Sequence, residues 1–262
     1  MKTTGFKPIV SISGRLMVRV LIVSAFIFTL TFTIFLRMSA NKMRNEASDN
    51  AHSELSNTIH QIDAILHAVE IAVENTAWVV PKSLAYPDSL YAITERLLRN
   101  NEFIYGSAIA FEPNYYKSQG HYFSPYSYRG KNGNIRSRQL GTGTYDYHYM
   151  DWYQIPKLLD SPYWSEPYFD EGGGDMIMTT YSYPIYDQLG HMVAIFTADL
   201  SLEWFAEQVN SIKPYPNAYN IMIGRGGTFL VHKTTENILT ETIFATARKS
   251  DDEELIATAR KM

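Results

Sequence analysis

The sequence has 262 residues, of which 45% are hydrophobic and 19% are charged, and its formal net charge is −4. This composition supports a sizeable core and excludes wholesale disorder, and the negative charge disfavours nucleic acid as a partner held by bulk positive charge. The chain contains no cysteine, which excludes a disulfide scaffold, a thiolate metal site and a cysteine nucleophile.

The N-terminal segment predicts a transmembrane helix over residues 16–36. Residues 20–36 carry no charge, and the whole segment is long enough to cross the ~30 Å hydrocarbon core of a bilayer. No acid precedes the apolar run, and four basic residues do: Lys2, Lys7, Arg15 and Arg19. This bias places residues 1–15 in the cytoplasm as a short tail. A cleaved signal peptide is the alternative, with Met38-Ser39-Ala40 as a weak cleavage site.

Residues 37–80 predict a long helix that continues from the membrane span. They contain neither Pro nor Gly, and Pro81 is expected to end the helix. Apolar residues recur at the alternating spacing of a heptad seam. They are Leu55, Ile59, Ile62, Leu66, Val69 and Val73. The seam either packs on its own domain or also pairs with a second copy near the membrane, where Ala47 and Ala51 form a weaker seam.

Residues 81–212 are predicted to form a module of helices and strands. We expect Asp88 to cap a helix over residues 89–100, and Ser201 to cap another over residues 202–212. Strands are expected at residues 103–111, 121–128, 176–186 and 191–198, with a polar turn region at 129–138 and weak alternation at 140–149. Strands clustered between helices favour an α+β fold with an antiparallel sheet.

Residues 213–262 are predicted to begin a second, incomplete module. Two short strands, at residues 219–223 and 228–232, flank a glycine-rich turn after Pro214 and Pro216, and a polar helix follows. Two short strands do not bury a core alone. We therefore expect further strands beyond this segment.

Sequence motifs for catalysis are absent. Gly141-Thr142-Gly143 is half of a dinucleotide fingerprint without the βαβ context. The spacing of Asp146, His148 and Asp151 fits no metal motif. Asp170, Glu171 and Asp175 surround three glycines like ligands of Ca²⁺, but without the EF-hand spacing. Glu166 and Asp170 are the residues of a glycosidase pair, but nothing in the sequence sets their separation. We expect no catalytic residue, no metal and no cofactor in this chain.

The segment from Tyr145 to Asp199 combines many aromatic rings with sparse acids. Rings attract a small cationic amine and exclude water from it, and carboxylates accept its charge-assisted hydrogen bonds. The alternative is that the rings fill a core and that Asp199 caps the helix after Ser201. The candidate ligand-binding residues are Tyr145, Trp152, Tyr153, Tyr168, Asp170 and Asp199.

The chain has, in this order, an anchor, a long helix and the strings DWY, WSEPYFD, TYSYPIYD, TADLSL and GRGGTFLVH. On the basis of this order, it resembles the double Cache (dCache) family of extracytoplasmic sensors over about residues 37–262. The resemblance implies a membrane-distal PAS-like module at 81–212 that binds amino acids, amines or carboxylates, and the start of a membrane-proximal PAS-like module at 213–262. It also implies a second membrane helix and a cytoplasmic output domain. Such sensors head histidine kinases, PPM-type serine phosphatases, cyclases and chemoreceptors.

In the amino-acid-binding subset of this family, the ligand residues match all six candidates, but Met150 stands where the subset has an Arg. An Arg clamps a carboxylate through a bidentate fork and Met does not. The resemblance therefore implies an intact amine half of the site. An α-amino acid fits only if Arg129, Arg136 or Arg138 takes over the carboxylate.

The predicted function is the small-molecule sensing region of an inner-membrane receptor, with its main body periplasmic or extracellular. We expect a homodimer, an amine or amino-acid-like ligand, no nucleic-acid partner, and an output domain outside this chain, either a histidine kinase or a serine phosphatase. The alternatives are an anchored binding or adhesion module without a signalling role, and an anchored hydrolase that uses Glu166 and Asp170.

Overall fold

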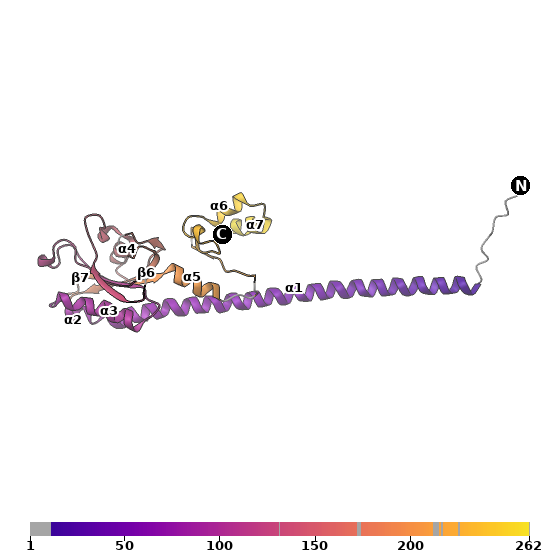
Figure 1. The fold of residues 1–262 in the computed structure, drawn as a ribbon, viewed down its shortest axis with the longest axis horizontal. Coiled ribbons are helices and arrows are strands. Elements are labelled where there is room, and N and C mark those ends of the chain that lie inside the picture. The colour runs from indigo at the N-terminus through magenta and orange to yellow at the C-terminus, as the bar shows by residue number, and fades with distance from the viewer. Residues whose placement is uncertain are drawn as a thin grey trace. The chain divides into compact units, whose positions relative to one another are not determined.

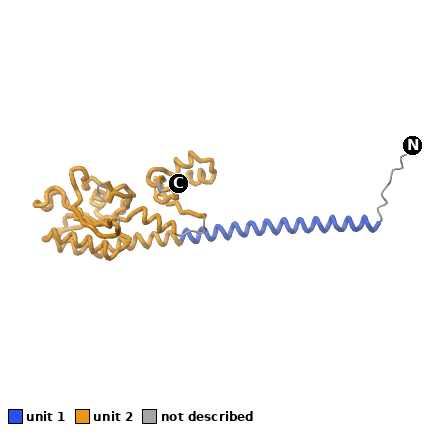
Figure 2. Tube along the Cα trace, viewed as in Figure 1, with its two compact units in different colours: residues 1–56 blue, residues 57–262 orange. Residues whose placement is uncertain are grey.

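The computed structural model describes residues 12–130, 132–171, 174–211, 215, 217–224 and 226–261. The chain divides into two compact units, residues 1–56 and 57–262, which Figure 2 colours separately. Lys2, Lys7 and most of the predicted cytoplasmic tail lie outside the described residues.

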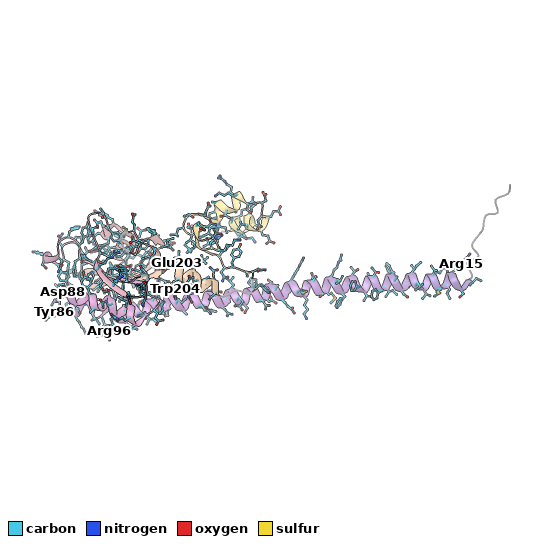
Figure 3. All side chains as sticks on the ribbon, viewed as in Figure 1. Arg15, Tyr86, Asp88, Arg96, Glu203 and Trp204 are labelled. Atoms are coloured by element: carbon cyan, nitrogen blue, oxygen red, sulfur yellow. The ribbon has the colours of Figure 1, made fainter. Side chains whose placement is uncertain are left out.

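The first unit is helical throughout its described length. Helix α1 covers Ile12–Ala77 without a break, so the predicted membrane span and the predicted long helix form one element. The apolar side chains of the span project outward from the helix, as Figure 3 shows, and Phe28 is 73% exposed. Among the described residues, α1 is the helix that is long and apolar enough to cross a membrane. Such an outward apolar surface suits a lipid environment.

The end of α1 lies in the second unit and packs on it. Val69 and Val73 are fully buried in the main core, whereas Leu55 and Ile59 remain about half exposed. The later half of the predicted seam thus packs on its own domain. Helix α1 ends at Ala77, three residues before its predicted end, because Pro81 falls in the first turn of the short helix α2 (Val80–Ser83).

A seven-stranded antiparallel sheet forms the centre of the second unit (Figure 1). Its order is β3-β2-β1-β7-β6-β4, and the short strand β5 also pairs with β6. The strands are β1 (Gly106–Phe111), β2 (Pro125–Arg129), β3 (Ile135–Gln139), β4 (Tyr163–Trp164), β5 (Tyr168–Phe169), β6 (Ile177–Tyr186) and β7 (Met192–Ser201). The predicted hairpin of β6 and β7 is the longest pair, and the predicted α+β class is confirmed.

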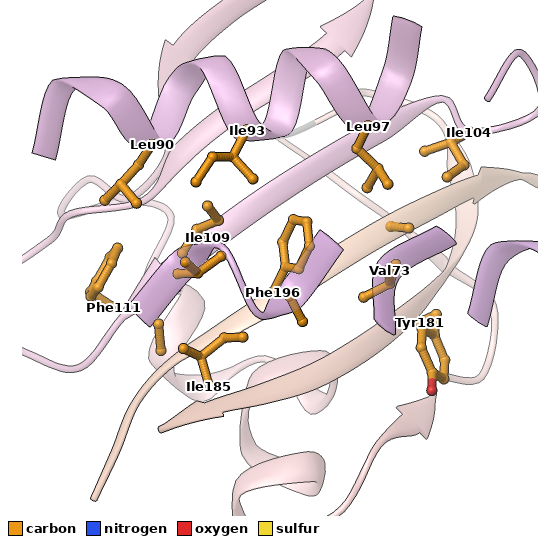
Figure 4. Close-up of a cluster of buried hydrophobic side chains, with 14 of the residues drawn as sticks. Val73, Leu90, Ile93, Leu97, Ile104, Ile109, Phe111, Tyr181, Ile185 and Phe196 are labelled. Carbon is orange, nitrogen blue, oxygen red and sulfur yellow. The ribbon is translucent and has the colours of Figure 1, made fainter. Parts of the chain in front are cut away.

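The main core lies between one face of the sheet and helices α1 and α3 (Leu90–Asn100). In Figure 4, Leu90, Ile93 and Leu97 of α3 point toward Ile109 of β1 and Phe196 of β7. Burial of each such side chain contributes about 1.5–3 kcal/mol. This apolar face anchors the sheet to the C-terminal end of α1.

The opposite face of the sheet is covered by an aromatic layer and by helix α4 (Asp151–Leu159). Its buried members are Ala108, Ala110, Tyr126, Leu140, Tyr145, Tyr147, Trp152, Tyr153 and Ile195. Small residues on β1 leave room above the strand for these large rings. The candidate ligand-binding residues therefore face away from α1.

Several local predictions need correction. Residues 135–139 form strand β3 inside the predicted turn region, and the second predicted strand begins only at Pro125. Helix α4, β4 and β5 were not predicted, because Pro156 and the dense aromatic residues obscured the period of α4. Asp88 lies in a 3₁₀ turn and does not cap α3. Ser201 does cap α5 (Leu202–Ser211), accepting the Trp204 N–H at 3.4 Å.

The last part of the chain contains a two-stranded ladder and two helices. Strands β8 (Met222–Ile223) and β9 (Phe229–Val231) pair antiparallel, within both predicted strand ranges. Helices α6 (Ile243–Lys249) and α7 (Glu253–Lys261) follow. Pro214, Pro216 and Arg225 lie outside the described residues.

Candidate ligand-binding site

The site is built on a point of close approach at the start of β1. Gly106 pairs with Asp199 of β7 on one side and with Tyr128 of β2 on the other. A Cβ atom on Gly106 would lie 2.5 Å from Asp199 Oδ2 and 2.6 Å from the Tyr126 hydroxyl. Only glycine leaves room for the carboxylate and the phenol to meet there.

Asp199 and Asp170 are both buried at this face of the sheet, close enough for the charge of Asp170 to act on Asp199. Asp170 Oδ1 accepts the Tyr145 hydroxyl at 2.7 Å, and Asp170 Oδ2 accepts the Gly174 N–H at 2.6 Å. Asp199 Oδ1 accepts the Thr180 hydroxyl at 3.0 Å. Three hydrogen-bond donors, Tyr145, Gly174 and Thr180, thus fix the orientation of the two carboxylates.

Tyr168 joins this network through Thr180. The hydroxyl oxygens of Tyr168 and Thr180 are 2.9 Å apart. Because the Thr180 proton is given to Asp199, Tyr168 donates to Thr180. The sequence did not single out Thr180, which occupies the position directly opposite Asp199 in the β6–β7 ladder.

Burial makes both carboxylates weaker acids than usual. Asp170 and Asp199 are only 4% and 5% exposed. Loss of solvation, reinforced by the nearby charge of Asp170, raises the pKa of Asp199 to about 7. Desolvation also raises the pKa of Asp170, against the opposing hydrogen bond from Tyr145. A cation placed between the two groups would relieve this cost.

Two polar groups of the aromatic layer are buried without a hydrogen bond of good geometry to any described residue. They are the indole N–H of Trp152 and the hydroxyl of Tyr126. Such groups normally find a partner, since an unsatisfied one costs about 1–3 kcal/mol. Against the dominant effect of burial, the Tyr126 hydroxyl lowers the pKa of Asp199 and the Trp152 N–H lowers that of Tyr145, so both groups lie at the candidate site.

Tyr153 is the predicted site residue that turns away from the carboxylate pair. Its ring is fully buried, and its hydroxyl donates to Glu112 Oε1 at 2.7 Å. Lys157 Nζ lies 2.7 Å from the same oxygen. The structure thus places Trp152 and Tyr153 in the aromatic layer with Tyr145, but the hydroxyl of Tyr153 bonds to the Glu112–Lys157 ion pair and not to the carboxylate pair.

The three candidate replacements for the missing Arg occupy different environments. Arg129 donates to the carbonyls of Ile104 and Asn101, both at 2.9 Å, and so fastens the loop after α3. Arg136 is exposed. Arg138, which is opposite Tyr126 in the β2–β3 ladder, stacks its guanidinium 5.1 Å from the Tyr128 ring centroid.

Arg138 is therefore the arginine associated with the site. Its positive charge lowers the pKa of Asp170 against the dominant effect of burial. Met150, at the position expected for an Arg, is half buried against the aromatic layer at the start of α4. The register of β2 and β3 brings Arg138 to the face of the sheet that carries Asp199.

The hydrolase alternative is not favoured by the geometry, because Glu166 is exposed while Asp170 is buried and hydrogen-bonded. The calcium alternative falls partly outside the described residues, since residues 172 and 173 are not described.

The site is linked to α1 through strand β6. Thr180 faces Asp199, and its neighbour Tyr181 points to the other face of the sheet, where its hydroxyl donates to Glu74 of α1 at 2.9 Å. Trp164, paired with Tyr181 in the β4–β6 ladder, donates its indole N–H to Glu70 at 2.8 Å. Two aromatic donors thus fasten α1 to the strand that carries Thr180.

Comparison with known families identifies this part of the chain. Residues 90–207 match the family described as methyl-accepting chemotaxis protein-like, first PDC sensor domain. Comparison with curated proteins finds no match. Residues 90–207 are therefore similar to a PDC sensor domain, and the resemblance to the double Cache sensors is confirmed.

Solved structures agree with this assignment. The extracellular domain mmHK1S-Z3, assigned to a histidine kinase, is 28% identical with a TM-score of 0.62, over 76% of this chain and 74% of that one. The Pseudomonas fluorescens chemoreceptor CtaA, solved with L-isoleucine, is 16% identical with a TM-score of 0.58, over 81% and 79%. The Pseudomonas aeruginosa PAO1 receptor PctC, solved with GABA, is 18% identical with a TM-score of 0.51, over 76% and 80%. The chain thus has the fold of extracellular sensor domains.

Proposed function

We propose that the chain is the extracytoplasmic sensing region of a membrane-anchored receptor, and that its ligand is a small amine or amino-acid-like compound. The observation that carries this proposal is the pair of buried carboxylates, Asp170 and Asp199, under an aromatic layer with an unsatisfied indole N–H. Buried acids are costly unless a cation offsets them. The ammonium group of a ligand supplies that cation.

The predicted residues have distinct roles in this proposal. Asp199 and Asp170 accept hydrogen bonds from the ligand ammonium, and Tyr145 and Tyr168 orient the two carboxylates. Trp152 covers the ammonium with its ring and donates its N–H to a ligand oxygen. Tyr153 holds α4 in place through Glu112.

Arg138 also gives the site a positive charge that can bind an anionic group of the ligand. Its guanidinium lies over Tyr128 on the same face of the sheet as Asp199. A ligand that carries both an ammonium and a carboxylate would be held between the acid pair and Arg138. The CtaA and PctC structures, which hold L-isoleucine and GABA, support a ligand of this class through their shared fold.

The signal is proposed to leave the site along β6 and α1. A ligand that pulls on Asp199 shifts Thr180, and the neighbouring Tyr181 passes the shift to Glu74 of α1. Helix α1 continues without a break into the candidate membrane span. The proposed receptor is a homodimer through the exposed residues Leu55 and Ile59, and a cytoplasmic histidine kinase or serine phosphatase reads the signal.

The test is ligand binding to the detergent-solubilised chain. A thermal-shift screen of the standard amino acids, GABA and aliphatic diamines should find a stabilising ligand, and calorimetry then gives its affinity. Asp199→Ala should weaken binding by about 30- to 3,000-fold, because loss of one buried charge partner costs roughly 2–5 kcal/mol.

The matched control is Asp151→Ala, which removes an exposed carboxylate from the same segment of the chain. It should bind the ligand like the parent. Unchanged binding by a folded Asp199→Ala variant would overturn the assignment of the site.

A further inference from the structure

A second group of polar side chains gathers next to the aromatic layer. His121, Asp146 and His148 each offer one ligand atom, and these three atoms lie within 4.8 Å of one another. His121 comes from the connection between β1 and β2, and the other two come from the turn before α4. We propose that this His–Asp–His cluster binds a divalent transition-metal ion of the Zn²⁺ class.

The orientation of His148 is the first argument. Its Nε2 lies 3.1 Å from the backbone carbonyl of Phe111, and a carbonyl only accepts, so Nε2 carries the proton of this bond. Metal-binding histidines are typically fixed in this way, with one ring nitrogen donated to a carbonyl and the other free for the metal. The imidazole of His148 is therefore set to present Nδ1 as a ligand.

Asp146 lies where a metal ion on Nδ1 would need an oxygen ligand. Its Oδ1 is 3.0 Å from His148 Nδ1 and accepts the His148 backbone N–H at 3.1 Å. A carboxylate oxygen and an imidazole nitrogen at this distance need a proton on Nδ1 or a metal ion between them.

His121 completes the set from a different part of the chain. Its Nδ1 lies 3.3 Å from the side-chain amide of Asn114, which leaves Nε2 as the ligand atom. Its ring centroid is 5.3 Å from that of His148. His121 is exposed while His148 is buried, so the site has an open side for the metal and for a water ligand.

The donor set decides the kind of metal. Two imidazole nitrogens and one carboxylate oxygen suit Zn²⁺ and its neighbours, whereas Ca²⁺ and Mg²⁺ prefer all-oxygen sites. Three protein ligands leave a fourth tetrahedral position for water. Sequence spacing did not reveal this set, because His121 reaches the other two only through the fold.

A bound metal would fasten the turn that carries Tyr145 to the β1–β2 connection. Trp152 follows the same turn at the start of α4. The metal would therefore stiffen the wall of the ligand-binding site, a consequence that rests on the proposed function, whereas the metal site itself does not.

The experiment uses the full chain in detergent, without a polyhistidine tag, and Zn²⁺ and Co²⁺ as probes. Equilibrium dialysis with elemental analysis should give one Zn²⁺ per chain, and Co²⁺ should give the visible absorption bands of a tetrahedral site. His121→Ala removes an exposed ligand and should weaken Zn²⁺ binding by at least about 100-fold. Saturating Zn²⁺ should raise the melting temperature of the parent by about 5 °C and should leave that of His121→Ala unchanged.

The matched control is His191→Ala. His191 also lies 3.5 Å from an acid, Asp187, but among the described residues no third metal-binding side chain joins this pair. His191→Ala should bind Zn²⁺ like the parent. The proposal is overturned if the parent binds no Zn²⁺, if His121→Ala binds it as tightly as the parent, or if Ca²⁺ competes effectively for the site.

Discussion

The two faces of the central sheet differ in chemistry although the same strands build both. The face toward α1 and α3 is mainly apolar, with Leu97, Ile109 and Phe196 at its centre. The face toward α4 buries two carboxylates among tyrosines. Adjacent strand residues alternate between these faces, so Thr180 contacts Asp199 while Tyr181 contacts α1.

In the proposed function, stability and ligand binding are divided between these two faces. The apolar face stabilises the fold and holds α1, because its residues are buried without electrostatic cost. On the polar face, burial makes the ionised form of Asp199 unfavourable, as its raised pKa shows. A cationic ligand would stabilise that ionised form. Variants on one face should therefore change stability, and variants on the other should change binding.

The largest effect on stability is expected on the apolar face. Leu97→Ala removes a side chain that is 2% exposed and should lower the free energy of unfolding by about 2–5 kcal/mol. Its ligand affinity, measured where the variant is folded, should stay close to that of the parent. The control is Leu158→Ala on α4, where the side chain is 78% exposed. Urea unfolding followed by tryptophan fluorescence gives the free energy of unfolding of both variants. A large loss of ligand affinity in Leu97→Ala would contradict the division of roles between the two faces.

A smaller and opposite effect is expected at Asp199. Its pKa is about 7 in the folded chain, above its ordinary value of 3.8, so the folded state holds a proton that the unfolded state has lost. The free energy of unfolding therefore falls as pH rises from about 4 to 7. Asp199→Asn removes the ionisable group and with it this pH dependence. The variant should be more stable than the parent at pH 8, by up to about 4 kcal/mol, and should differ little from it at pH 4. Equal stability at both pH values would contradict the cost assigned to this carboxylate.

The smallest effect is expected at Arg138 and depends on the ligand. Arg138→Met should weaken binding of ligands with a carboxylate by roughly 10- to 100-fold, and should leave simple amines almost unchanged. Arg136→Met on the same strand is the control, because Arg136 is exposed. If amines and amino acids lose affinity equally in Arg138→Met, the arginine is not the carboxylate partner.

Strong local patterns predicted much of the fold. Helix α3, the β6–β7 hairpin and the cap at Ser201 were visible because period, turn residues and capping residue agreed. Helix α4 was missed because Trp152, Tyr153 and Pro156 form its buried side, and aromatic residues with an internal proline do not favour a helix.

The long-range parts of the site were beyond a single sequence. Thr180, Gly106 and Arg138 reach Asp199 or the aromatic layer through strand register, which local spacing does not specify. The candidate acids and rings themselves were named from residue type and family resemblance, and their role as a ligand site is still a prediction.

The number of protons exchanged on ligand binding reports whether Asp199 is the group that binds the ligand ammonium. Calorimetry of the ligand from the screen, at pH 6.5 in two buffers of different ionisation enthalpy, counts these protons. Asp199 is largely protonated at this pH, and an ammonium ligand should ionise it, releasing more than about half a proton per ligand in the parent and almost none in Asp199→Asn. Binding with no proton release in the parent, or with the same release in Asp199→Asn, would contradict the account.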